Sequence, residues 1–83
     1  MRYTVVWSDI AILQLAAIWN AARDRNAVST AQHQIDRLLR INPPLNVDPD
    51  TGRCTIDVLP LRATFEVVDL DRLVRVHSLK RIP

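Results

Sequence analysis

The sequence predicts an α+β domain with the element order β-α-α-β-β-β, in which a helical hairpin packs on a four-stranded, mainly antiparallel sheet as a two-layer sandwich. Three observations support this prediction. Bulky residues alternate with polar ones at the start, recur with helical spacing in the next third, and alternate again towards the end. The 83 residues are 48% hydrophobic and 24% charged, which fits a single domain over residues 1–83 and excludes a disordered chain or a multidomain enzyme.

The first strand is expected over residues 2–7, where polar and bulky side chains alternate. Tyr3, Val5 and Trp7 fall on one face of such a strand, and Trp7 is expected in the core. A strand this short is not stable alone, so it must join the same sheet as the later strands.

The first helix is expected from Asp9 to Ala22. Ser8 is a good N-cap residue, and Asp9 suits the positive end of the helix dipole. The spacing of a core-facing stripe is met by Ile12, Leu15, Ala16 and Trp19.

This helix carries no charge between Asp9 and Arg23. A membrane span is excluded, because it requires roughly 20 apolar residues. Three apolar residues, Ile10, Leu13 and Ala17, lie away from the expected core stripe. Either a second element covers them, or they form an exposed patch that binds a partner.

The second helix is expected from about Ala27 to Ile41, where Asn42-Pro43-Pro44 ends it. Asp36 and Arg40 form a favourable i, i+4 pair on this helix. A short polar link joins the two helices, which are expected to form an antiparallel hairpin. The apolar stripe of the second helix comprises Val28, Ala31, Ile35, Leu38 and Leu39.

Residues 42–52 hold three prolines and the only glycine, so they are expected to form a loop. Alternation with a period of two follows in three segments, which predicts a three-stranded meander. The segments are 53–58, 61–67 and a last one ending near Lys80, separated by turns at Leu59-Pro60 and at 69–72.

The amino-acid composition excludes several kinds of functional site. A single glycine excludes a glycine-rich phosphate loop, and a single cysteine, Cys54, excludes an internal disulfide and a cysteine-based zinc site. His33 and His77 have no metal-binding spacing, so we expect neither a metal nor a cofactor. No signal peptide is visible and the lone thiol suits a reducing compartment, so we expect a cytoplasmic protein. Ten of the eleven basic residues are arginine, which favours bidentate contacts to phosphate or carboxylate although the net charge is only +2.

Strand parity predicts which side chains occupy the sheet face away from the helices. Pairing through the two turns places Asp57 opposite Arg62, Thr64 opposite His77, and Glu66 opposite Arg75. This open face is expected to be a polar groove with an excess of arginine, formed by Arg53, Thr55, Asp57, Arg62, Thr64, Glu66, Arg75 and His77.

In this order of elements, the sequence resembles the RelE/ParE superfamily of bacterial type II toxins. The resemblance covers most of the chain and rests on the opening strand with its two helices, on Ile35-Asp36-Arg37-Leu38-Leu39 before the prolines, on Leu61-Arg62-Ala63-Thr64-Phe65-Glu66-Val67, and on the strand leading to Lys80-Arg81. It implies a compact toxin of a plasmid-stabilisation or addiction type, neutralised by an antitoxin encoded beside it. Some members of the superfamily cut mRNA on the ribosome, and others poison DNA gyrase.

The resemblance also implies site residues. Arg62 aligns with the arginine that the ribonuclease members use, and Lys80 and Arg81 match their basic pair. His77 is suited to act as acid or base at neutral pH. The candidate catalytic set is therefore Arg62, His77 and Arg81, and the candidate phosphate-binding set is Arg53, Arg62, Arg75, Lys80 and Arg81.

Two departures weaken the ribonuclease hypothesis. Thr55 and Asp57 stand where ribonuclease members carry lysines, and no residue matches the tyrosine or histidine often found beyond the basic pair. We therefore favour a ParE-like or catalytically degenerate toxin that acts by binding proteins, with a ribosome-dependent endoribonuclease using 2′-hydroxyl attack as the alternative. Either way the patch of Ile10, Leu13 and Ala17 is expected to bind the antitoxin, and self-association into a homodimer is the competing explanation.

Overall fold

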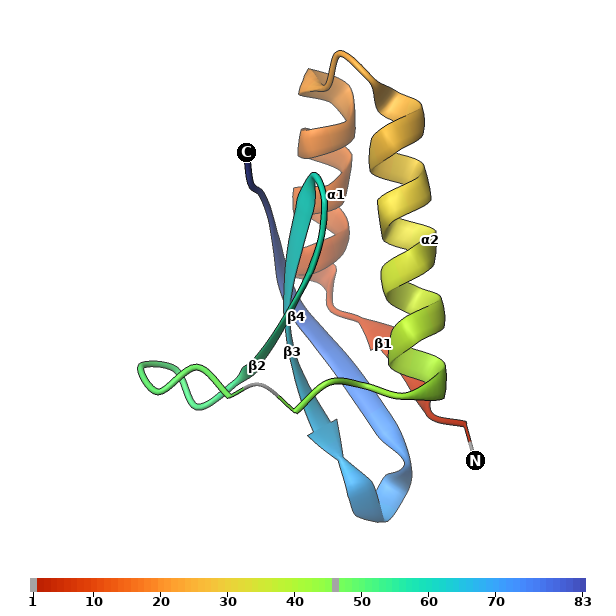
Figure 1. Ribbon diagram of the computed structural model, residues 1–83, viewed down its shortest axis with the longest axis vertical. Helices are drawn as coiled ribbons and strands as arrows, with labels where there is room; N and C mark the ends of the chain where they lie inside the picture. The colour runs from red at the N-terminus through yellow and green to blue at the C-terminus, as the bar shows by residue number, and fades with distance from the viewer. Residues whose placement is uncertain (1, 46) are drawn as a thin grey trace.

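The computed structural model describes residues 2–45 and 47–83. It confirms the element order β-α-α-β-β-β (Figure 1). The elements are β1 (Thr4–Trp7), α1 (Asp9–Ala21), α2 (Arg25–Ile41), β2 (Cys54–Val58), β3 (Leu61–Val68), a short 3-10 turn (Asp69–Asp71) and β4 (Leu73–Arg81).

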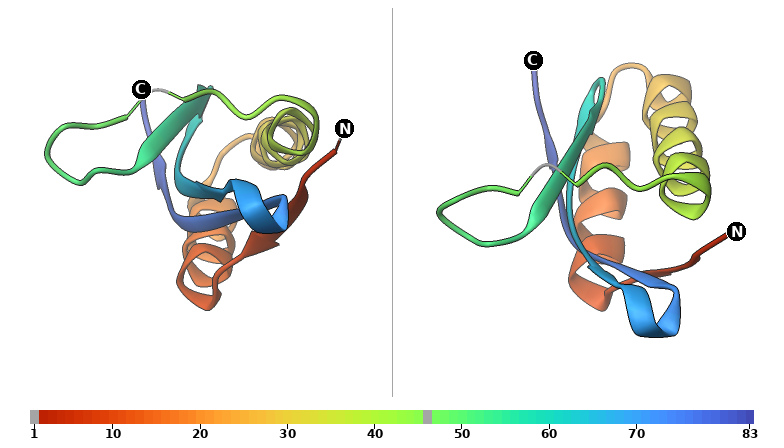
Figure 2. Two further views of the ribbon diagram at one scale, coloured as in Figure 1. Left: turned by 90° about the horizontal axis from the view of Figure 1, so that it is seen from below. Right: turned by 60° about the horizontal axis from the view of Figure 1, so that its bottom comes forward.

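The four strands form one mixed sheet in the order β1-β4-β3-β2. β2 pairs with β3 and β3 with β4 in antiparallel fashion, whereas β1 pairs with β4 in parallel. The two helices run antiparallel beside each other against this sheet (Figure 2). The first strand therefore joins the same sheet as the meander, as its short length predicts.

The core lies between the two helices and the sheet. Phe65, Leu61 and Val74 from the strands are fully buried there. The stripe predicted on α2 is confirmed at four of its five positions, because Val28, Ala31, Ile35 and Leu39 are buried while Leu38 is 39% exposed. Trp7 is half-buried against this core, and its indole Nε1 donates a hydrogen bond to Asp36 Oδ1 of α2 at 3.1 Å.

The core stripe predicted on α1 is wrong at three of its four positions, because only Leu15 of the four packs against the core. Ala11 is its fully buried residue, whereas Ile12 is 51% exposed and Trp19 is 40% exposed. β4 extends beyond the residues that pair with β1, and α1 lies along this unpaired part of the strand. Hydrogen bonds from there orient the helix. Ser8 Oγ donates to the His77 carbonyl at 3.0 Å, and Gln14 Oε1 accepts from the Leu79 amide at 2.7 Å. These contacts turn one side of α1 towards β4, and that side is buried. Leu15 and Ile18 pack against the core there, beside Ala11.

Arg25 fixes the turn between the helices. Asp24 caps α2 by accepting from the Ala27 amide at 3.0 Å. The Arg25 guanidinium donates to the carbonyls of Trp19 and Asn20 at 3.3 and 3.4 Å, and it lies 4.6 Å from the centroid of a Trp19 ring. A positive charge at the carbonyl end of α1 opposes the negative end of the helix dipole, which stabilises this arrangement.

Candidate functional site

The open face of the sheet has the predicted pairing at two of three positions. Asp57 pairs with Arg62 and Glu66 with Arg75, but Thr64 pairs with Ser78 rather than with His77. The reason is a bulge between Thr64 and Phe65, which leaves His77 as an extra residue in β4. The alternation of side chains between the two faces of the sheet is interrupted at this point, so Val76 and Leu79 are both buried although they are three positions apart.

Arg62 is held by a carboxylate. Its Nε and Nη2 atoms donate to Asp57 Oδ1 and Oδ2 at 2.7 and 2.8 Å, in a bidentate pair. The hydrogen bonds from Arg62, and then its charge and that of Lys80, hold the pKa of Asp57 below its ordinary value. The same hydrogen bonds raise the pKa of Arg62. Lys80 is the residue opposite Arg62 on β4, so these three charges form one cluster near the β2–β3 turn.

A second cluster surrounds Glu66. Arg75 Nη1 donates to Glu66 Oε1 at 2.9 Å, and His77 Nε2 lies 3.2 Å from the same oxygen. The His77 Nε2 atom is shielded from solvent and makes no hydrogen bond within the described residues. Glu66 is four positions after Arg62 on β3, which is a distance of about 13 Å along the strand. His77 and Arg62 therefore belong to different clusters.

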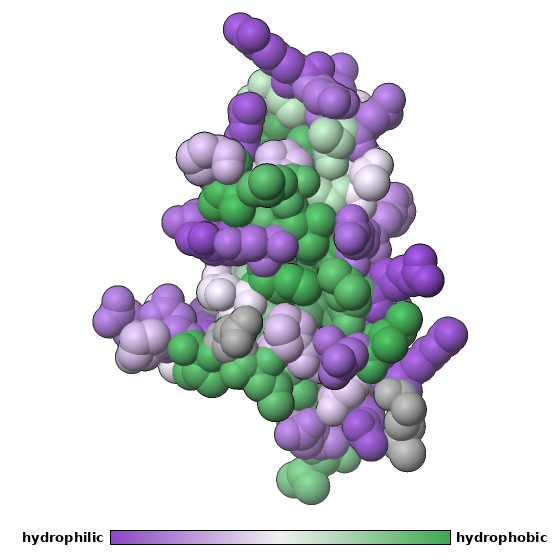
Figure 3. All heavy atoms as spheres, viewed as in Figure 1, coloured by the Kyte–Doolittle hydropathy of each residue, from purple (hydrophilic) through white to green (hydrophobic). Residues whose placement is uncertain are grey.

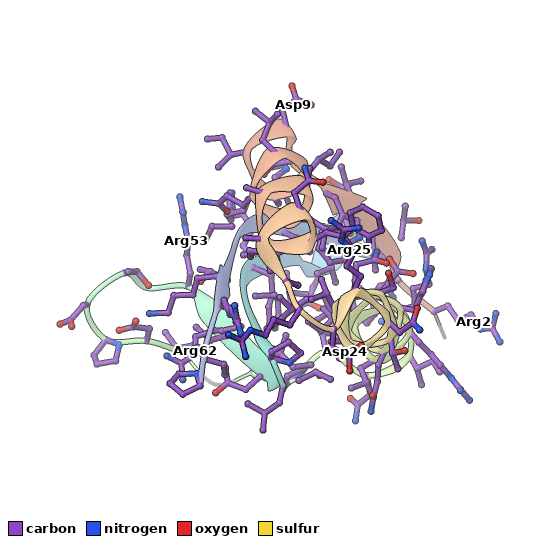
Figure 4. All side chains as sticks on the ribbon, turned by 90° about the horizontal axis from the view of Figure 1, so that it is seen from above. Arg2, Asp9, Asp24, Arg25, Arg53 and Arg62 are labelled. Atoms are coloured by element: carbon purple, nitrogen blue, oxygen red, sulfur yellow. The ribbon has the colours of Figure 1, made fainter. Side chains whose placement is uncertain are left out.

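Arg81 lies apart from both clusters. Together with Arg23 and Asp24 it lines a cleft of about 360 Å³, which lies between the α1–α2 turn and the β2–β3 turn. Leu79 is buried and Lys80 is opposite Arg62, so Arg81 returns to the helix-covered side of the sheet. Arg53 is exposed just before β2, and Figure 4 shows it with Arg62 on the side of the molecule away from α2. The structure thus divides the candidate catalytic residues among three locations.

Sequence reasoning missed Arg23, which shares the cleft with Arg81. No local motif marks it, because the cleft forms only where the helical turn meets the β2–β3 turn. The face on which Arg81 lies follows from strand alternation counted forward from the buried Leu79, once the bulge is known.

The candidate partner-binding patch on α1 is exposed. Ile10 is 62% and Leu13 is 70% exposed, and Ala17 is also exposed. A second apolar surface lies on the opposite helix, where Figure 3 shows apolar side chains over α2, the loop after it and the β2–β3 hairpin. The exposed apolar residues of these elements are Leu38, Ile41, Leu45, Val47 and Leu59.

Among residues 2–45 and 47–83 there is no group of histidine, cysteine or acidic side chains that could hold a metal ion. In the same described part of the chain, the helices are too short or too polar to cross a bilayer.

Comparison with known proteins identifies the fold. Sequence comparison finds no matching family model and no matching curated protein. Structural comparison finds a chromosomal ParDE toxin–antitoxin system from P. aeruginosa with a TM-score of 0.74 and 17% identity, covering 98% of this chain and 97% of that one. The chain has the RelE/ParE fold.

Two further solved structures of this fold are similar over 98% of the chain. One is a RelBE toxin–antitoxin complex from Mycobacterium tuberculosis, with a TM-score of 0.68 and 16% identity over 92% of that chain. The other is an arginine-to-alanine mutant of the E. coli toxin RelE in the free state, with a TM-score of 0.61 and 14% identity over 84% of that chain. The RelE/ParE fold predicted from the sequence is confirmed by these likenesses, which cover nearly the whole chain.

Proposed function

We propose that this chain is the toxin component of a type II toxin–antitoxin system, and that it acts by binding a protein rather than by cutting RNA. The RelE/ParE fold over 98% of the chain supports the toxin role. One observation supports protein binding over RNA cleavage. Arg62, which aligns with the arginine of the ribonuclease members, donates two hydrogen bonds to Asp57 and is therefore already paired.

RNA cleavage by 2′-hydroxyl attack requires a base, an acid and a cation on the phosphate within one site. Arg62 is neutralised by Asp57, His77 lies beside Glu66 in another cluster, and Arg81 lines a separate cleft. These groups do not converge on one phosphate. The arrangement supports a ParE-like target, such as DNA gyrase, more than the ribosome-bound mRNA of the alternative hypothesis.

The antitoxin is expected to bind the outer surface of α2. A hollow of about 520 Å³ there is lined by His33, Gln34, Arg37, Leu38, Ile41 and Asn42. Arg37 also borders a neighbouring hollow with Arg2 and with Arg40, which is paired with Asp36. An apolar floor with arginines beside it fits an amphipathic, acidic segment. Ile10, Leu13 and Ala17 on α1 remain proposed partner-binding residues, on a helix that has no positive charge to recognise an acidic segment.

The activity is tested by inducing the chain in bacteria and measuring amino-acid and thymidine incorporation with time. We expect DNA synthesis to fall first. We also expect purified protein to cleave ribosome-bound mRNA weakly or not at all, and Arg62→Ala to leave toxicity unchanged. Asp57→Asn is the matched variant, because it frees the Arg62 guanidinium and should increase RNA binding without restoring cleavage. Efficient cleavage that Arg62→Ala abolishes would establish the ribonuclease alternative, with His77 in its catalytic set.

A further inference from the structure

The exposed face of α1 is unusual for a small domain. From Asp9 to Ala21 the helix has no charged residue after its first position, and its polar residues are Gln14 and Asn20. Gln14 is used in binding β4. The outward-facing side therefore consists almost wholly of apolar side chains, which include Ile12, Leu13 and Ala16.

This face continues into a groove between the helices. The groove has a volume of about 360 Å³, and its walls come mainly from Ile12, Leu15, Ala16 and Trp19 of α1. Ser29 and Gln32 of α2 form the other wall, and both are uncharged. A partner that fits this surface must itself present an uncharged apolar helix. An acidic segment would leave its charges without partners here.

The two ends of α1 carry opposite charges. Asp9 is exposed at the N-terminal end, and Figure 4 shows it pointing away from the sheet and from α2. Arg25 covers the C-terminal end, with its guanidinium over the Trp19 ring. Asp9 makes no ion pair with the described residues, and Arg25 bonds there to carbonyl oxygens of Trp19 and Asn20 rather than to a carboxylate. Both residues are exposed, and no ion pair with the described residues neutralises either charge.

We propose that α1 is a self-association surface, on which a second copy of this chain packs with its own α1 antiparallel to the first. A two-fold axis through the helix centre would bring Asp9 of each copy to Arg25 of the other, and would also align the helix dipoles favourably. The centre falls near Ala16, whose small side chain allows the two helices to approach closely. The flanking Ile12, Leu13 and Trp19 side chains of both copies would then be shielded from water.

The expected dimer is reversible. One helix pair buries less than the roughly 1,200–2,000 Å² of a stable, specific interface, so assembly should depend on protein concentration. This inference does not depend on the toxin role, because it concerns the isolated chain. It also leaves the hollow beside Arg37 on α2 open for an acidic partner.

Charge exchange tests the orientation. Sedimentation velocity over a wide concentration range should show a monomer–dimer equilibrium for the natural sequence. Asp9→Lys and Arg25→Glu should each weaken dimerisation about tenfold or more, which corresponds to the loss of about one charge pair at each end. The double variant should recover most of the affinity. Damage to the helix ends alone would make the double variant the weakest of the three, and that result would overturn the proposal.

Cross-linking gives a second, independent test. Cysteine placed by Ala16→Cys lies near the proposed axis and should form an intermolecular disulfide on mild oxidation. Ala21→Cys is the matched control on the same helix, because antiparallel packing separates its two copies by about 15 Å. Equal cross-linking of both variants, or of neither, would overturn the proposal. A third result would also overturn it: the chain stays monomeric at every concentration, and Leu13→Glu weakens neutralisation of the chain by an antitoxin encoded beside it. The exposed face of α1 would then bind the antitoxin.

Discussion

The two helices of the hairpin differ in how far their sequences determine their orientation. α2 is apolar on one side and polar on the other, and its buried residues Val28, Ala31, Ile35 and Leu39 are the ones that helical spacing predicts. α1 is apolar on nearly all sides, and the stripe predicted for it is exposed at Ile12 and Trp19. Burial of apolar area orients α2, whereas hydrogen bonds to β4 orient α1.

This difference shows what an amphipathic pattern can and cannot specify. Rotating α2 about its axis would move charged residues into the core, at a high cost in desolvation. Rotating α1 would exchange one apolar side chain for another, so hydrophobicity alone leaves several rotations close in free energy. A helix of this kind has apolar surface left over after it packs, and that surface is available to a partner.

The largest expected effect compares two isoleucines, one on each helix. Ile35→Ala removes a fully buried side chain of α2 and should lower the free energy of unfolding by about 3 kcal/mol, because a cavity remains. Ile12→Ala is the matched control on α1 and should cost less than about 1 kcal/mol in the monomer. Urea denaturation at low protein concentration measures both. Equal costs would mean that α1 packs through the stripe that its spacing predicts.

The sequence was sufficient to predict the order of the helices and strands. Turn residues and a period of two located the meander, and the proline-rich break located the end of α2. The pairs Asp57–Arg62 and Glu66–Arg75 also followed from counting through the turns. These features depend on neighbours along the chain or across a short turn, where local rules apply.

The candidate site was less predictable, because it depends on tertiary packing. The bulge at Thr64 shifts the register of β4 and takes His77 out of line with Thr64. No residue near the bulge marks it in the sequence, and a shift of one residue changes which side chains face each other. Arg81 is separated from Arg62 because the β2–β3 turn lies against the α1–α2 turn. No single segment of the sequence determines that contact.

A middle-sized effect compares two glutamines. Gln14 Oε1 accepts a hydrogen bond from the Leu79 amide, which β1 is too short to pair. Gln14→Ala should therefore lower the free energy of unfolding by about 1–2 kcal/mol, because the amide loses its partner in a half-buried position. Gln34→Ala changes an exposed residue of α2 and should stay within about 0.5 kcal/mol of the natural sequence. Hydrogen exchange at the Leu79 amide should accelerate in the first variant and not in the second. An unchanged exchange rate would show that α1 is held to β4 by apolar contact alone.

The smallest expected effect concerns Asp36, which ties α2 to β1. Its carboxylate accepts from Arg40 Nε at 2.8 Å and from Trp7 Nε1 at 3.1 Å. Partial burial acts to raise the pKa of Asp36, but the hydrogen bonds from Arg40 and Trp7 and the charge of Arg40 outweigh it, so the pKa lies below its ordinary value.

A lowered pKa in the folded state fixes the sign of the pH dependence. The stabilisation is fully present above the unfolded pKa of about 3.9 and is lost as the pH falls through the lower, folded value. Asp36→Asn should therefore cost less than about 1 kcal/mol at neutral pH, and the difference from the natural sequence should shrink as the pH falls below the unfolded pKa. Asp71→Asn, in the exposed turn before β4, is the control for the removal of one surface carboxylate. A difference that is the same at every pH would mean that Asp36 holds α2 to β1 through its shape and hydrogen bonds and not through its charge.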